Sequence, residues 1–203
     1  MGRRAMRHFS FRPTLAIRGR KFKGLRGYAG KPFHPPLTDV PVTAYLFAAV
    51  FDVVSIAVKG GHPELARQLF MAGTWTILGG AFVSVLAALT GWADWRTSSE
   101  PGTQARRTIN SHAITMITVT LIVLADLALR GLVYNDRMAP PGGIVALSVI
   151  AAALVTIGAT YGGTLVYDYG FNVETAGDSP VWHKSEIDHM PGEPPAVAAT
   201  ESG

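Results

Sequence analysis

Four long apolar runs limit what this chain can fold into more than any other feature of its sequence. They cover roughly residues 42–58, 69–90, 113–133 and 144–166. A helix needs about 20 apolar residues to cross ~30 Å of hydrocarbon at ~1.5 Å per residue, and each run is close to that length. Helices of a soluble bundle usually keep a polar stripe, whereas the run 144–160 has almost none. The sequence therefore predicts an all-α integral membrane protein, built as a four-helix bundle.

The charged residues divide the chain into three parts. Ten of the eighteen Lys and Arg residues precede Pro32, and the part after Tyr169 holds one lysine and several acids. Basic residues beside a membrane span favour the cytoplasmic side and its anionic headgroups, which explains this segment better than nucleic-acid binding does. We therefore expect a basic cytoplasmic arm over 1–33, a transmembrane domain over 34–170 and a flexible, acidic, Pro-rich tail over 171–203.

The connection between the second and third runs sets the expected orientation. It carries Arg96, Arg106 and Arg107, so the positive-inside rule places it on the same side as the basic arm. Both termini are then cytoplasmic, and the chain crosses the inner (plasma) membrane of a bacterial cell several times. The chain has no cysteine, which excludes disulfides, thiolate metal sites and an iron–sulfur cluster ligated by this chain.

A proline-rich motif precedes the first run. Residues His34–Pro41 read HPPLTDVP. Pro41 suits a first helical turn, where its missing N–H costs nothing, and Thr38 or Asp39 is suited to cap the exposed amides. This reading places His34 just outside the hydrocarbon, at the level of the lipid headgroups.

Four aspartates indicate an internal repeat. Asp52 and Asp94 are 42 residues apart, as are Asp126 and Asp168, so one offset of 74 residues relates the two pairs. Asp94 and Asp168 each follow a run rich in small residues, and aromatic residues flank both. The pattern fits a duplicated helical hairpin. Because the chain has fourteen acidic residues, chance coincidence is the alternative.

The topology gathers two histidines at the cytoplasmic end of the bundle. Imidazoles that face each other across a bundle, here His34 and His112, are suitable axial ligands for a b-type haem. The propionates of the haem would then lie toward Arg96, Arg106 or Arg107.

Two other interpretations of the same end stay open. With Asp94 and Asp168, the histidines His34 and His112 form a suitable set for a hard or borderline divalent metal or for a proton relay. In a purely structural interpretation, the two histidines hydrogen-bond to Asp94 and Asp168 and fix the helix ends.

Two further aspartates lie within the apolar runs. A carboxylate in hydrocarbon costs ~2.5–3.5 kcal/mol, so Asp52 and Asp126 must be protonated, paired or turned toward a cavity. Arg130 follows Asp126 by one helical turn and is a ready partner. For Asp52 the sequence offers only Lys59, two turns on, or a partner on another helix. The two carboxylates form either a proton or ion site near the outer face or two structural pairs.

Four segments resemble the bacterial membrane proteins grouped as domain of unknown function 2231 (DUF2231). They are HPPLTDVP at 34–41, GWADW at 91–95, SHA at 111–113 and LVYDYG at 165–170. The resemblance covers about residues 34–170. It implies a four-helix membrane domain, and because the family has no settled activity, no catalytic residue is transferred from it.

The tail adds a second resemblance. Residues 179–192 look like the connector that leads, in some relatives, into a Rieske iron–sulfur domain. This chain has no cysteine, so the resemblance implies a separate redox protein as partner.

These observations lead to three functional hypotheses. The first is a membrane subunit of an electron-transfer assembly that anchors a redox partner, holds haem b between His34 and His112 and has no catalytic activity of its own. The second is a small proton-coupled transporter that uses Asp52 and Asp126. The third is a structural scaffold without a cofactor. An oligomer or a larger complex is expected in each case.

Overall fold

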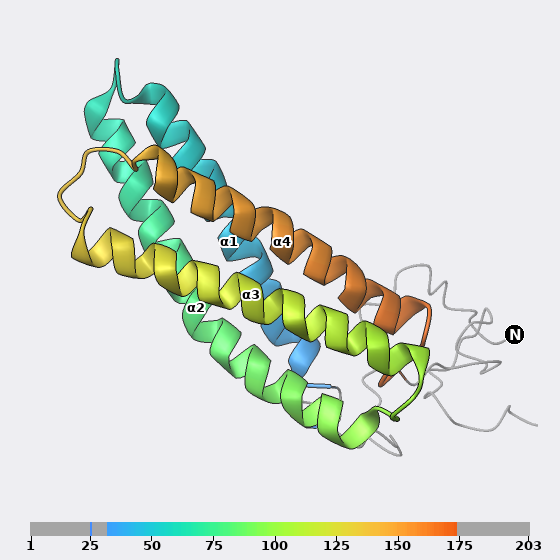
Figure 1. Cartoon of the computed structure of the whole chain (residues 1–203). Helices are drawn as coiled ribbons and strands as arrows, with labels where there is room; N and C mark the ends of the chain where they lie inside the picture. The colour runs from blue at the N-terminus through green and yellow to red at the C-terminus, as the bar shows by residue number, and fades with distance from the viewer. Residues whose placement is uncertain (1–24, 26–31, 174–203) are drawn as a thin grey trace, which may run out of the picture.

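Four helices make up the described part of the chain. A computed structural model describes residue 25 and residues 32–173, with α1 at His34–Val58, α2 at Pro63–Ser98, α3 at Gln104–Leu132 and α4 at Gly142–Tyr167 (Figure 1). The fold is an all-α bundle, as predicted. Nearly all of the predicted basic arm (1–33) and acidic tail (171–203) lies outside the described residues.

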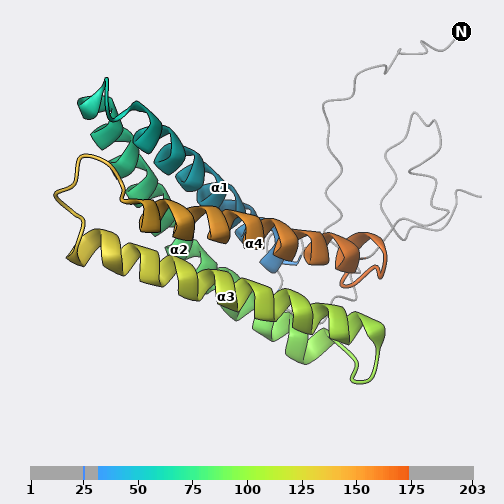
Figure 2. The same ribbon diagram turned by 45° about the horizontal axis from the view of Figure 1, so that its top comes forward.

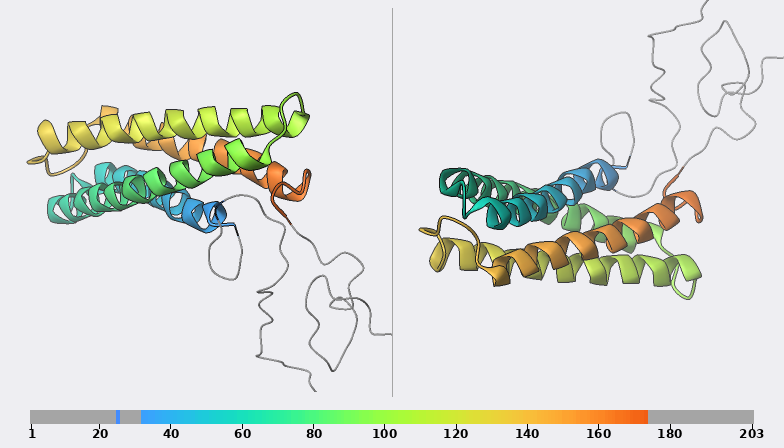
Figure 3. Two further views of the ribbon diagram at one scale, coloured as in Figure 1. Left: turned by 90° about the horizontal axis from the view of Figure 1, so that it is seen from below. Right: turned by 90° about the horizontal axis from the view of Figure 1, so that it is seen from above.

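The helices form two antiparallel hairpins that lie side by side. The most extensive contacts join α1 to α2 and α3 to α4, and smaller contacts join α1 to α4 and α2 to α3. Helices α1 and α3 are therefore diagonal to each other in the bundle, as the turned views show (Figures 2 and 3). The α1–α2 and α3–α4 connections lie at one end. The α2–α3 connection, the start of α1 and the end of α4 lie at the other end.

The distribution of side-chain size identifies the bundle as a membrane protein. All four helices are long and apolar enough to cross a bilayer. Large apolar side chains such as Phe82 and Ile114 are about two-thirds exposed, at 72% and 66%, on the outer surface. Four of the nine buried residues in the central cluster are alanines, among them Ala44, Ala48 and Ala81. Because lipid solvates large apolar groups and small residues let helices approach closely, this arrangement is typical of a transmembrane bundle.

Helix α1 begins earlier than the sequence predicts. His34 is its first residue, so Pro41 lies inside the helix instead of in its first turn. The reason is that Pro35 and Pro36 already fill first-turn positions, where a missing N–H is tolerated. Thr38 does not cap the helix, because its hydroxyl donates to the carbonyl of Pro35 at 2.7 Å. His34 is thereby carried on the helix, with a fixed direction relative to α2.

Three of the four glycines of α2 set the close approach of α1. Each of these glycines lies against a polar side chain of α1. Successive glycines are seven and then eleven residues apart, and their partners on α1 have the same spacing in the opposite chain direction. The pairs are Gly73 with Asp52, Gly80 with Tyr45 and Gly91 with His34. The antiparallel register of this hairpin therefore places three polar residues of α1 in positions that a larger residue on α2 would fill.

Candidate functional site

The imidazole of His34 is held by the backbone of α2. Its Nδ1 lies 2.8 Å from the carbonyl oxygen of Ala87 and 3.3 Å from the hydroxyl of Thr90. A carbonyl can only accept, so Nδ1 carries a proton and donates it, and in the neutral imidazole Nε2 then keeps its lone pair. Gly91 lies against the ring, since a Cβ built there would be 2.7 Å from Cε1 of His34.

His112 is held in the same way by the second hairpin. Its Nδ1 donates to the carbonyl oxygen of Gly158 at 2.8 Å. Gly162 follows Gly158 by four residues, as Gly91 follows Ala87, and a Cβ on Gly162 would lie 3.6 Å from Cε1 of His112. Each hairpin thus fixes one imidazole through a carbonyl and places a glycine beside it.

The structure brings the two imidazoles together. Their ring centroids are 6.3 Å apart and their planes cross at 88°. That separation is compatible with an edge-to-face ring pair, and also with one metal atom held between two nitrogens at ~2 Å from each. In residue 25 and residues 32–173, no hydrogen bond engages Nε2 of either histidine. The pair is therefore chemically suited to ligate a metal through Nε2.

The aspartates at this end do not act as the structural interpretation predicts. The side-chain partners of His34 and His112 are backbone carbonyls and a threonine hydroxyl, so the predicted pairing with Asp94 and Asp168 is wrong. Asp94 is buried, at 5% exposure, and its Oδ1 has no hydrogen-bond partner among the described residues. Asp168, its predicted counterpart in the repeat, is exposed and forms the C-cap of α4.

A metal held by side chains alone needs more ligands than the described part of the chain brings together. No group of three or more His, Asp or Glu side chains with metal-binding geometry occurs among the described residues. The predicted set of His34, His112, Asp94 and Asp168 therefore gains no support there as a complete ligand shell. The histidine pair alone remains as a candidate ligand set.

The three predicted arginines differ in how many contacts their guanidinium groups already make within the protein. The guanidinium of Arg106 lies 3.8 Å from the ring centroid of Trp95, and it donates to the carbonyl of Trp95 at 3.0 Å and to the hydroxyl of Ser99. Arg96 is exposed and lies over the ring of Trp92, at 5.5 Å. Arg107 is exposed as well. The guanidinium of Arg106 thus already bonds within the α2–α3 connection, whereas the guanidinium groups of Arg96 and Arg107 are exposed at the surface.

At the opposite end of the bundle, Arg130 joins the two intramembrane aspartates. Its Nε donates to Asp126 at 2.9 Å, which confirms the predicted pairing one helical turn apart. Its Nη1 donates to Asp52 on α1 at 3.1 Å, and its Nη2 donates to both carboxylates. We call Asp52, Asp126 and Arg130 the Asp–Arg triad; each is at most 1% exposed.

Sequence reasoning missed the link between Asp52 and Arg130. These residues are 78 positions apart, so no local spacing rule relates them. The signal was nonetheless present: Arg130 is a basic residue at the end of an apolar run, and Asp52 had no partner of its own. Sequence reasoning also did not connect Gly91 and Gly162 with the histidines beside which they lie.

Comparison with known proteins gives one match. A family model described as "Predicted membrane protein (DUF2231)" matches residues 30–175, which is most of the chain. No curated protein matches. No solved structure matches either.

Proposed function

The chain belongs to the DUF2231 family of predicted membrane proteins, and we propose that it is a membrane subunit of an electron-transfer assembly, with a haem b held between His34 and His112. In this role the chain holds a redox group and anchors a partner, without catalysis of its own.

One observation carries the proposal. Two imidazoles from diagonal helices lie 6.3 Å apart, and each is anchored through Nδ1 so that Nε2 remains for ligation. In the described residues no third side chain completes a metal site. Two protein ligands are too few for an ordinary divalent ion, but they are the number that haem iron needs, because the porphyrin supplies the other four.

The residues around the histidines fit this use. A hydrogen bond from the far nitrogen of a ligating histidine fixes its tautomer and ring orientation, and the carbonyls of Ala87 and Gly158 accept these bonds. Gly91 and Gly162 have no side chain and so leave room for the two rings to pack against them. When bound, a b-type haem supplies one-electron oxidation and reduction, and the half-buried position of the two rings limits access of water.

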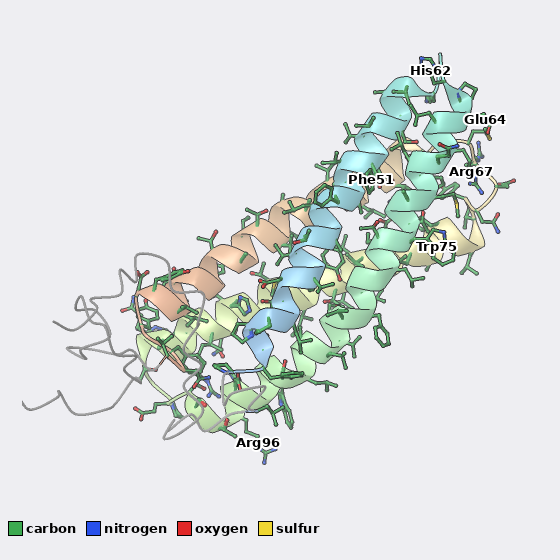
Figure 4. The ribbon with its side chains drawn as sticks, turned by 180° about the vertical axis from the view of Figure 1, so that it is seen from behind. Phe51, His62, Glu64, Arg67, Trp75 and Arg96 are labelled. Atoms are coloured by element: carbon green, nitrogen blue, oxygen red, sulfur yellow. The ribbon has the colours of Figure 1, made fainter. Side chains whose placement is uncertain are left out.

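The charges at this end are compatible with haem propionates. Arg96 and Arg107 are exposed at the end of the bundle that holds the α2–α3 connection. Figure 4 shows Arg96 far from His62, which lies at the other end. Both remain candidate propionate partners. Arg106 is a weaker candidate because its guanidinium already bonds to Trp95 and Ser99.

The proposed partner is a separate redox protein of the iron–sulfur (Rieske) type, docked at the end that carries the histidine pair. Its support is the resemblance of residues 179–192 to a connector, and these residues lie outside the described part. A partner at this end would shorten the path for electrons to His34 and His112.

Optical absorption of the purified full-length protein tests the proposal. Material from haem-replete cells is expected to show a Soret band that His34→Ala or His112→Ala abolishes. His62→Ala is the matched control, because His62 is exposed at the opposite end of the bundle (Figure 4) and should leave the band intact.

A folded but colourless wild-type protein would rule out the haem and leave the scaffold role. In that case stoichiometric copurification with partners is the expected behaviour. The transporter role has less support, because both Asp52 and Asp126 are bound by Arg130.

A further inference from the structure

The Asp–Arg triad uses every donor of one guanidinium. Nε and Nη2 of Arg130 donate to the two oxygens of Asp126, at 2.9 and 3.1 Å. Nη1 and Nη2 donate to the two oxygens of Asp52, with the Nη1 bond at 3.1 Å. The fifth N–H, on Nη1, points to the hydroxyl of Thr74 on α2, at 3.2 Å. The hydrogen bonds of Arg130 are therefore satisfied, but its charge is opposed by two carboxylates.

The two helices that carry the triad offer no second positive charge near it. On α1 the other residues able to carry a charge near neutral pH are His34 and Asp39, at least thirteen residues before Asp52 and so ~20 Å or more away along the helix. Lys59 caps the helix seven residues after Asp52, ~10 Å along the axis, and is exposed outside the apolar run. On α3 the other charged residues are Arg106 and Arg107, in the first turn of the helix and at the opposite end from Arg130.

The other two helices do not supply the missing charge. Helix α4 contains no Asp, Glu, Lys or Arg along its whole length, Gly142–Tyr167. On α2, Glu64 and Arg67, one acid and one base, occupy the first two turns (Figure 4), and Asp94 and Arg96 lie near the other end of the helix. The guanidinium of Arg67 donates to backbone carbonyls of the α3–α4 connection, at 2.6 and 2.7 Å. With both carboxylates ionised, the triad would carry one uncompensated negative charge within the apolar helices.

We propose that the Asp–Arg triad binds one proton, on the carboxyl group of either Asp52 or Asp126, and so forms a proton-binding site within the membrane-spanning bundle. The proton comes from the aqueous phase and adds to a carboxylate oxygen, so the triad becomes neutral. Neutralising the triad is favourable because a net charge in hydrocarbon has a high free energy. The site is independent of the histidine pair, which lies at the opposite end of the bundle.

A proton fits this site better than a metal cation. Each of the four carboxylate oxygens already accepts a hydrogen bond from Arg130. A cation would have to displace these bonds and lie beside the guanidinium, which repels it. A proton needs only a free lone pair on one oxygen.

Infrared spectroscopy of the full-length protein in lipid bilayers tests the proposal. The carbonyl stretch of a protonated carboxylic acid is expected at neutral pH, with the intensity of one carboxyl group per chain. Asp52→Asn and Asp126→Asn should each remove it, because one carboxylate and one guanidinium are neutral without a proton. Asp168→Asn is the matched control at an exposed aspartate, and Asp94→Asn tests the other buried one; both should keep the band.

Absence of the band in the wild type at neutral pH would overturn the proposal. So would a band that disappears only in Asp94→Asn, or one that survives in both triad variants. If neither triad variant folds, the wild type and Asp94→Asn still decide: a band that persists in Asp94→Asn supports the triad, and a band that is lost there excludes it.

Discussion

At Gly91 the missing side chain allows the imidazole of His34 to take its place. We expect Gly91→Ala to displace this ring, because the added Cβ would lie 2.7 Å from Cε1 and 3.1 Å from Nδ1 of His34. The displacement should break the hydrogen bond to Ala87 and destabilise the protein by ~1–3 kcal/mol, the usual cost of overpacking. Thermal unfolding in detergent measures this cost. If the protein is pigmented, the Soret band should weaken as well.

Gly162→Ala is the matched control for this prediction. Its Cβ would lie 3.6 Å from Cε1 of His112, which is an ordinary van der Waals contact, so the variant should be close to the wild type in stability. Equal effects at Gly91 and Gly162 would show that the close contact with His34 does not fix that ring.

At the scale of single residues, the sequence reveals which side chains need partners better than it reveals the partners. The pairing of Asp126 with Arg130 follows from helical spacing alone. The bond from Arg130 to Asp52 depends on how two hairpins pack, which local spacing does not encode. The histidines were predicted to share one end of the bundle, but their carbonyl partners depend on the register of each hairpin.

At the scale of helices, the apolar runs predicted the number and type of elements, while their ends depended on other residues. All the predicted runs except the last residue of the third lie within the observed helices, which extend further into polar sequence. Helix α2 has 36 residues and is therefore ~54 Å long, well beyond the hydrocarbon thickness of ~30 Å. Hydropathy detects the part of a helix in lipid, so it misses the turns that continue into the interface.

The predicted repeat of hairpins matches the structure in part. His34 and His112 are held by equivalent carbonyls, and a glycine follows each of these by four residues. Yet Asp94 is buried, whereas Asp168 is exposed. No single sequence offset relates the histidines, the glycines and the aspartates of the two hairpins, because the helices of the two hairpins differ in length. The offset of 74 residues that relates the aspartates therefore does not relate the glycines.

The approach of α1 to α2 should depend on Gly80. A Cβ there would lie 2.7 Å from the Cβ of Ala44 and 3.0 Å from Cε1 of Tyr45, so Gly80→Ala must push the two helices apart. We expect a loss of ~1–3 kcal/mol in stability, measured as a lower unfolding temperature in detergent. Gly79→Ala, one residue earlier, meets nothing within 4 Å and should be neutral or slightly stabilising. A neutral Gly80→Ala would contradict close packing at this position.

At the scale of the whole molecule, polar chemistry is concentrated at two levels of a bundle whose outer surface is apolar. The histidine pair lies at the end with the α2–α3 connection, and the Asp–Arg triad lies toward the other end. Each level joins α1 to α3, the diagonal helices, through side chains alone. The two hairpins are therefore linked at both levels by residues that a purely apolar bundle would not need.

The absence of cysteine allows a direct test of how the bundle crosses the membrane. Single cysteines introduced by Gly61→Cys and Asp136→Cys lie in the α1–α2 and α3–α4 connections, and one from Glu100→Cys lies between α2 and α3; all three positions are exposed. Because the connections alternate between the two ends, the first two should react from one side with an impermeant thiol reagent and the third from the other.

The positive-inside rule further predicts that position 100 is cytoplasmic and reacts only after the membrane is opened. Labelling of position 100 in intact spheroplasts would reverse the orientation while keeping the bundle. Labelling of positions 61 and 136 from opposite sides would separate His34 from His112, and neither the histidine pair nor the Asp–Arg triad could then form.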